Sequence, residues 1–468
     1  MRRGAGVLLQ TQPPSATRQG ASAIITTMHR SLLLAILLCG CPGPGVGVPL
    51  DTQAPDTHDS QPGDSGIETI PDAWEPPVYD PSDLPQGVPH INLVLDAAAL
   101  ARLDADPFHA ADERGVFIDD DGVSHEVDIS YRGAYALLNV MSYYDLRNWK
   151  IKFDGDDRYQ DRREWNFNYE PHFQQKLAYD LLRFAGVAVP GAQHVVLELN
   201  GEHQGVYLQY EDPDNSHWLY DQLGDDQGDL YKAAYDLPYE TQFFGDLTVL
   251  GQADQDYLLH YNKKTNLGDA AEDYAVLRAF IDELNTVSDA DFPAWLEASV
   301  DVERLRSYLV VSNFMANWDS YPQRPKNYWL YQDLRSQRMV YVPWDLDATF
   351  GPNTDGTYNQ MGTGVSVLYN LREQEYAPPH AEEGWDRPLV RRMMALEDQH
   401  QAYIERYREL SGSILSEDYL LGRLAALEAM VEPQASVTDR QRLQSYGSQI
   451  RSFIQRRCAT VEAELAGM

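Results

Sequence analysis

The sequence predicts an α+β fold in two parts: an antiparallel sheet with one inserted helix, and then a mostly helical half. Three observations support this prediction. Short segments of alternating apolar and polar residues, separated by turn dipeptides, fill residues 90–211, and apolar residues recur at a spacing near 3.6 from residue 273 onward. A third observation is a hairpin placed between the helices of the second half, which joins a polar loop to an apolar strand.

The first half is expected to contain four strand regions and two helices. The Asp-Gly and Asn-Gly dipeptides predict tight hairpin turns, and a Gly after an amphipathic run predicts a helix end. In chain order the expected elements are a strand at His90–Asp96, a short helix after it, a hairpin at Gly115–Gly133 turning at Asp121–Gly122, a strand at Asn148–Asp154, a helix at Phe173–Gly186 and a hairpin at His194–Glu211 turning at Asn200–Gly201. The segment that begins at Gly228 is either one further strand or a crossing segment.

The second half is expected to be helical around one hairpin. Its expected elements are a helix from Asp273, a helix capped by Asp301 that runs to Asn317, a loop at Trp318–Asn327, a hairpin at Tyr328–Asp347, a Gly-, Pro- and polar-rich segment at about 352–386, and helices from about Arg387 to Glu464.

The charge of the chain limits its partners. Among 468 residues there are 37 Lys and Arg against 72 Asp and Glu, for a formal charge of −35. Such a field repels phosphate backbones, so we expect no nucleic-acid partner. An anionic ligand such as ATP would need metal ions and a local basic cluster in order to bind.

The N-terminus is expected to be a targeting segment. "MHRSLLLAILLCGC", Met28–Cys41, has basic residues before an apolar run that is too short to span a membrane. Leu38–Cys41 is similar to the bacterial lipobox, which predicts lipidation of Cys41; an ordinary secretory signal is the alternative. We expect residues 1–41 to be this segment, with 1–27 a possible mis-assigned start, and residues 42–89 to be a disordered tether rich in Pro, Gly and Asp. A cell-envelope location follows, either lipid-anchored or secreted.

Two acids end the last strand of the predicted hairpin. In "MVYVPWDLDATFG", Asp345 and Asp347 are two residues apart, so they share a face if the strand extends through both. Two like charges in one space favour a cation or a proton between them. The alternative is that an Asp after a strand simply caps a helix or turn.

The order helix, polar loop, hairpin, acid-ended strand and further helices predicts an atypical protein-kinase-like two-lobed fold. In such a fold a loop Asp takes the hydroxyl proton, and a loop Asn and a strand-end Asp hold Mg²⁺ on the ATP phosphates. The expected N-lobe spans about 90–240 and the C-lobe about 241–468.

The residues themselves resemble the spore coat protein H (CotH) kinase-like family from about His90 to the C-terminus. The resemblance lies in "YRG", "NWKIKF", "LNGEHQGVYLQYE", "GDLYK", "NWDSYPQRPKNYWLY" and "VPWDLDATFG". It implies Asp319 as the catalytic Asp, Asp345 as a metal ligand and Asn327 as a second one. Asp347 is either an additional ligand or a turn cap.

The basic residues near these motifs are expected to bind the nucleotide. Lys150 or Lys152 would contact phosphate, with Lys152 the first choice, and Arg132 would lie nearby. Lys326 would neutralise the transferred phosphoryl group, and the backbone of Glu211 would meet adenine. Three features depart from ordinary kinases: no G-x-G-x-x-G loop is present, no His-Arg precedes Asp319, and Asp319 and Asn327 are eight residues apart rather than five.

Three functions compete at this point. The resemblance implies a secreted or lipid-anchored atypical kinase that uses ATP with Mg²⁺ or Mn²⁺ and phosphorylates Ser or Thr of an exported protein. The second is a catalytically weak surface protein for adhesion or coat assembly. The third is a glycan hydrolase with Asp319 and Asp345 as acid and base, which the motif order disfavours.

Overall fold

The computed structural model describes residues 74–84, 87–107, 110–133, 147–169, 172–233, 244–267, 273–351, 362–369, 371 and 386–468. Cys41, the targeting segment and most of the predicted tether lie outside these residues. None of the described helices has both the length and the apolar character needed to cross a membrane.

The first half forms a closed barrel of seven strands in the order β1-β2-β3-β4-β5-β7-β6. Its interior is apolar and aromatic; along β4, for example, Trp149, Ile151 and Phe153 face inward. The helix α2, Ala97–Ala105, follows β1 and is capped at Asp96. The strands are β1 His90–Val94, β2 Glu113–Ile118, β3 Ser124–Tyr131, β4 Trp149–Phe153, β5 Glu164–Asn168, β6 Ala192–Leu199 and β7 Glu202–Tyr210.

One pairing corrects the predicted antiparallel sheet. β1 pairs with β6 in parallel, and this pairing closes the barrel. About 100 residues separate the two strands, so the pairing cannot be predicted from a turn sequence between them. The predicted hairpin at Asn200–Gly201 is confirmed, because both turn residues have positive φ, 53° and 78°, as a type I′ turn requires.

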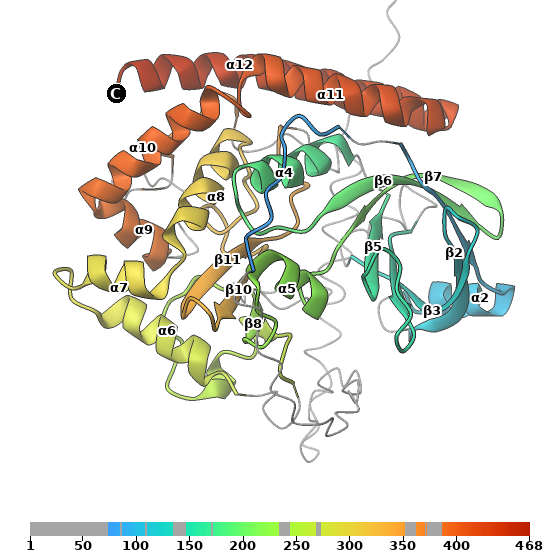
Figure 1. The fold of residues 1–468 in the computed structure, drawn as a ribbon, viewed down its shortest axis with the longest axis horizontal. Helices are drawn as coiled ribbons and strands as arrows, with labels where there is room; N and C mark the ends of the chain where they lie inside the picture. The colour runs from blue at the N-terminus through green and yellow to red at the C-terminus, as the bar shows by residue number, and fades with distance from the viewer. Residues whose placement is uncertain are drawn as a thin grey trace, which may run out of the picture. The chain divides into compact units, whose positions relative to one another are not determined.

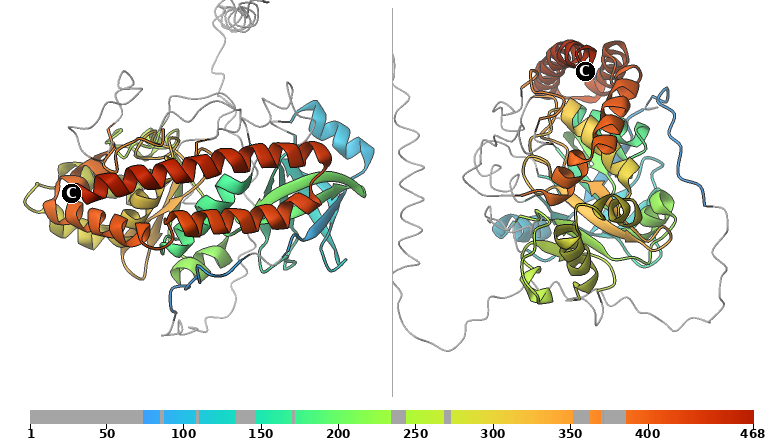
Figure 2. Two further views of the ribbon diagram at one scale, coloured as in Figure 1. Left: turned by 90° about the horizontal axis from the view of Figure 1, so that it is seen from above. Right: turned by 90° about the vertical axis from the view of Figure 1, so that its left-hand side faces the viewer.

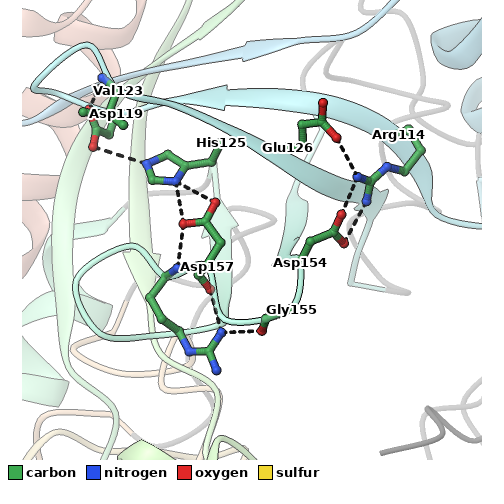
Figure 3. A network of polar contacts seen from close by, with 9 residues as sticks. Arg114, Asp119, Val123, His125, Glu126, Asp154, Gly155 and Asp157 are labelled. Atoms are coloured by element: carbon green, nitrogen blue, oxygen red, sulfur yellow. Dashed lines mark hydrogen bonds and ion pairs between the residues drawn. The ribbon is translucent and has the colours of Figure 1, made fainter. Parts of the chain in front are cut away.

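Acids at one end of the barrel are paired with nearby basic groups (Figure 3). The His125 Nδ1 lies 2.9 Å from Asp157, and its Nε2 lies 3.5 Å from Asp119 at the β2–β3 turn. Arg114 contacts Glu126 and Asp154 beside them. Asp119 of the acid-rich β2–β3 turn thus lies close to His125 of β3.

A second sheet has the order β11-β10-β8-β9. β8 pairs with β10, so the segment after Gly228 is a strand of this sheet rather than of the barrel. Its strands are β8 Leu230–Ala233, β9 Tyr261–Lys263, β10 Tyr328–Asp333 and β11 Arg338–Pro343.

Helices surround the second sheet (Figure 1). α4 follows the barrel strand β5 and packs against both α8 and α11, so it connects the barrel to the helical half. Figure 2 shows α11 and α12 as two long neighbouring helices. The helices are α4 His172–Phe184, α5 Ser216–Leu223, α6 Ala275–Thr286, α7 Phe292–Ser299, α8 Val302–Phe314, α9 Pro388–Ala395, α10 Glu397–Ser411, α11 Glu417–Val431 and α12 Val437–Ala466.

The described end of the predicted tether contacts these elements. The Tyr79 hydroxyl accepts hydrogen bonds from Arg183 of α4 at 3.0 Å and from Gln222 of α5 at 2.7 Å. The Pro81 carbonyl accepts one from Tyr419 of α11 at 2.9 Å. Disorder over residues 42–89 thus stays a prediction only up to residue 73, since residues 74–84 make specific contacts.

Candidate functional site

The loop after α8 and the segment after β11 are joined by two backbone hydrogen bonds. Trp344 N donates to Asn327 O at 3.0 Å, and Phe350 N donates to Met315 O at 2.8 Å. These bonds hold residues 315–327 beside residues 344–350. The two segments that carry the predicted catalytic and metal-binding residues therefore lie together.

The end of β11 differs from the expectation. The strand stops at Pro343, and Asp345 has φ of 52°. Because Asp345 is in the left-handed region, the alternation argument for Asp345 and Asp347 does not apply. Asn327 has φ of 58°, and Asn and Asp are the side chains that tolerate this conformation best.

Asp319 is surrounded by donors from its own loop. Its Oδ2 accepts a hydrogen bond from Asn327 Nδ2 at 3.0 Å and lies 2.9 Å from Lys326 Nζ. Its Oδ1 is buried and has no hydrogen-bond partner among the described residues, although Arg324 lies 3.8 Å away. One carboxylate oxygen is thus left to accept a bond from a ligand.

The pKa of Asp345 is shifted by its surroundings. Burial raises the pKa of Asp345, and the charge of Asp319 raises it further, against the opposing effect of Lys326, Arg132 and Lys232. The two carboxylates therefore repel each other in a poorly solvated place. A bound cation or a proton would relieve this repulsion.

Tyr179 of α4 lies near the same group. Its hydroxyl is buried and has no hydrogen-bond partner among the described residues. Burial raises the pKa of Tyr179 well above its usual range, and Tyr210, Asp345 and Asp347 add to the shift. Asp347 is therefore close to the site, and its role as an additional ligand or a turn cap stays a prediction.

Arg132 and Lys232 bring positive charge to Asp345. Arg132 donates to Asn168 and to the Tyr210 hydroxyl, and its guanidinium lies 5.1 Å from the centre of the Tyr210 ring. Lys232 of β8 lies over the rings of Trp329 and Trp344, at 5.6 and 5.9 Å. Lys232 was not among the predicted site residues, although the "GDLYK" motif that contains it was a usable signal.

The two strand lysines have different surroundings. Lys150 Nζ lies 2.7 Å from Glu164 and 3.6 Å from Asp212, whereas Lys152 Nζ lies 3.1 Å from Asp112. Asp212 and Asp345 both act on Arg132, so Lys150 belongs to the charge network of the site. Lys150 thus shares the neighbour Asp212 with Arg132; which lysine contacts phosphate stays a prediction, with Lys152 the first choice from the sequence.

Glu211 follows β7 and is engaged in local contacts. Its carboxylate accepts from Arg162 Nε at 2.7 Å and from Gly191 N at 2.5 Å. Its own N–H donates to Gly191 O at 3.1 Å. The backbone contact of Glu211 with adenine stays a prediction, and its N–H is already bonded.

A second group of carboxylates lies next to Lys150. Oxygen atoms of Glu164, Asp212 and Asp214 lie within 4.8 Å of one another. Burial and the neighbouring Asp212 raise the pKa of Asp214, whereas Lys150 and Lys264 outweigh burial and lower the pKa of Asp212. Sequence reasoning did not single out this group, because its members come from two separate strand ends.

Comparisons with known proteins agree on a family. A family described as "CotH kinase protein" matches residues 129–461. The "Inner spore coat protein H" of Bacillus subtilis (strain 168) is 27% identical over 235 residues, which cover 49% of this chain and 60% of that protein.

A solved structure of the toxin–antitoxin system HipA, HipB and operator DNA from Shewanella oneidensis MR-1 also matches. The match has 12% identity and covers 68% of this chain and 60% of that chain, but its TM-score of 0.26 is too low to support any argument about the fold. The family match does support an assignment, because residues 129–461 are well over half of the 468-residue chain. This chain belongs to the CotH kinase protein family.

Proposed function

We propose that this protein is a metal-dependent phosphotransferase that moves the γ-phosphoryl group of ATP to Ser or Thr of an exported protein. The observation that carries the proposal is the meeting of Asp319, Asn327 and Asp345 with the cations Lys326 and Arg132. Phosphoryl transfer is mostly positioning and charge stabilisation, and this group can supply both. The family match supports a kinase-like protein.

In this proposal the barrel is the N-lobe and the second sheet with its helices is the C-lobe. The charges from the two parts converge at Asp345: Arg132 comes from the barrel side, Lys232 from β8 and Asp319 from the loop after α8. A two-lobed kinase-like arrangement accounts for a site built from both parts.

The residues fit a divalent cation. Asp345 repels Asp319, the Oδ1 of Asp319 accepts no hydrogen bond from the described residues, and Asn327 offers an amide oxygen beside them. Oxygen ligands of this kind are those that Mg²⁺ and Mn²⁺ prefer. When bound, the metal would neutralise part of the phosphate charge.

The roles of the chain's own residues follow from their contacts. Asp319 would orient the attacking hydroxyl and accept its proton, and Lys326, 2.9 Å from Asp319, would counter the charge of the group in transfer. Arg132, Lys150 and Lys232 would hold the remaining phosphates. Asp347 is proposed as a further ligand on the Tyr179 side.

Asp345→Asn tests the metal assignment. Asn resembles the neutral form of a carboxyl whose pKa is already raised, so the fold and melting temperature should be retained. Calorimetry with ATP and Mg²⁺ or Mn²⁺ should show binding by the wild type and none by the variant. Equal ATP affinity in the two proteins would reject Asp345 as a ligand.

The location proposed for this protein is the bacterial cell envelope, lipid-anchored through Cys41 or secreted. The matched relative is named as a spore coat protein, which supports a place outside the cytoplasm. Membrane fractionation of Cys41→Ala against the wild type tests the anchor, and an unchanged membrane fraction would reject it.

That name also favours a second function, as a structural coat or surface protein with little catalysis. One measurement distinguishes the two proposals: whether the protein, once it has bound nucleotide, transfers phosphate to an acceptor. Nucleotide binding followed by transfer to an acceptor supports the kinase, whereas nucleotide binding without transfer across a panel of acceptors supports the structural function.

A further inference from the structure

A group of three carboxylates lies beside Lys150, one of the proposed phosphate contacts. Its members are Glu164, Asp212 and Asp214. Arg132 and Lys232 are each within electrostatic reach of both Asp345 and Asp212. A ligand whose phosphates lie at Arg132 and Lys232 can therefore extend toward Asp212. Glu164 and Lys150 keep 22% and 25% of their side chains exposed, so the carboxylate group opens to solvent.

Apart from the neighbouring Asp214 carboxyl, which hydrogen-bonds with Asp212, two buried acceptors in this group have no donor among the described residues. They are Asp212 Oδ1 and Asn166 Oδ1. Asn166 is 1% exposed, and its Nδ2 donates to Asp212 Oδ2 at 3.3 Å, so its amide lies against the carboxylates. Buried acceptors without donors are unfavourable, and a ligand that brings donors would relieve them.

Either a divalent cation or hydroxyl groups could satisfy such acceptors, and the local charge decides between them. Three lysines, Lys150, Lys232 and Lys264, already act on Asp212. Because burial and Asp212 raise the pKa of Asp214, these three positive charges at least match the negative charge of the three carboxylates, and a divalent cation would add unbalanced positive charge. Hydroxyl donors add none and are therefore favoured.

We propose that Asp212 and Asp214, with Asn166, accept hydrogen bonds from the neighbouring hydroxyls of a ribose ring, so that the site selects ribonucleotides. This inference rests on the proposed function, because it takes ATP as the ligand. A site built to bond a hydroxyl strongly rejects the analogue that lacks it, since the buried carboxylate is then left unpaired.

The test compares ATP with 2′-deoxy-ATP and 3′-deoxy-ATP on the purified chain with Mn²⁺, by calorimetry. The wild type should bind ATP at least about tenfold more tightly than one or both analogues. Asp214→Asn should weaken ATP binding toward the affinity of the analogues and leave the analogues nearly unchanged. Asp112→Asn, which removes the partner of Lys152 outside this group, should keep the wild-type preference.

The outcomes separate the inference from the proposed function. Equal wild-type affinities for ATP and both deoxy forms would overturn the ribose contact and leave the kinase proposal standing. Failure to bind any nucleotide would overturn the kinase proposal. Mn²⁺ binding without nucleotide that Asp214→Asn abolishes and Asp345→Asn does not would show a cation site in place of the ribose contact. The wild-type comparison needs no variant to fold.

Discussion

Asp319 and Asp345 interact through their negative charges. Each is partly buried near the other, and the positive groups around them do not cancel the repulsion at Asp345, whose pKa stays raised. Asn327 and Lys326 fix the orientation of Asp319 through its Oδ2 and leave Oδ1 without a hydrogen-bond partner among the described residues. At this scale the site is a pair of acids, and in the proposed function a bound cation relieves their repulsion.

Asp319→Asn should keep ATP affinity near that of the wild type and lower phosphoryl transfer by about 10²–10⁴-fold, which is the usual value of a general base. Single-turnover transfer to a Ser-rich acceptor, measured with both Mg²⁺ and Mn²⁺, checks this. A variant as active as the wild type would remove Asp319 from the mechanism.

Lys150→Ala and Lys152→Ala form a matched pair on one strand. Because Lys150 lies beside Asp212 and Lys152 pairs with Asp112, only Lys150→Ala should weaken ATP binding, by roughly tenfold for one lost charged contact. Calorimetry on both variants measures this. A larger loss of ATP affinity in Lys152→Ala than in Lys150→Ala would support Lys152 as the phosphate contact, as the sequence predicted.

The sequence placed these residues well where a motif is continuous and poorly where a site is assembled from distant strands. Asp319 and Asn327 occur in one loop, and Asp345 follows a strand that pairs with the next residues after that loop. Asp212 and Asp214 follow the barrel strand β7, whereas Lys232 lies on β8 of the second sheet, and no local pattern predicts that they lie close together. Lys152 was preferred over Lys150 because the apolar Ile151 and Phe153 flank it; the charges opposite each lysine, which distinguish the two in the structure, cannot be found from spacing.

At the scale of elements, α8 is held at its C-terminal end by a buried arginine of α12. Arg457, 0% exposed, donates to the Asn313 side chain at 2.7 Å and to Phe314 O at 3.3 Å, and it also reaches the Tyr407 hydroxyl at 3.2 Å. A cation at this end satisfies unpaired carbonyl groups and complements the helix dipole. The loop with Asp319 begins directly after it, so α12 fixes where that loop starts.

Arg457→Met should lower the free energy of unfolding by roughly 2–4 kcal/mol, because buried carbonyl groups lose their donor. Arg456→Met, the exposed neighbour on α12, should change it by less than about 0.5 kcal/mol. Urea unfolding of both variants provides the measurement. Similar small losses in the two would show that solvent replaces the Arg457 contacts.

Elements with their own start and stop signals were predicted correctly, and those without them were missed. The cap at Asp301 and the turn at Asn200–Gly201 are examples of local signals that the structure confirms. β5, β9, α5 and α7 were missed because they are short, and the parallel β1–β6 contact was missed because it joins distant parts of the chain.

At the scale of the whole molecule, acid stability is limited by buried groups that must stay neutral. His194 is 1% exposed, and burial, with the nearby Lys176, lowers its pKa to about 3. Between the ordinary histidine value and about 3, the unfolded chain binds a proton that the folded chain does not. Stability is therefore complete above about pH 6.5 and falls as the pH drops below it.

Between pH 7.5 and 5.0 the wild type should lose about 2 kcal/mol more stability than His194→Leu, at about 1.4 kcal/mol per pH unit below 6.5. Urea unfolding at the two pH values measures the difference. His203→Leu, at an exposed position of β7, should follow the wild type. Equal losses in the wild type and His194→Leu would show that His194 is protonated in the folded state.

The closed barrel has a consequence for how this protein meets other chains. Every one of its seven strands is paired on both sides, so the barrel offers no row of free backbone N–H and C=O groups. Unpaired sheet edges are templates for aggregation and for the addition of a strand from another protein. The barrel is therefore protected from edge-to-edge association with other chains. Any partner must recognise it through side chains and not through an added strand.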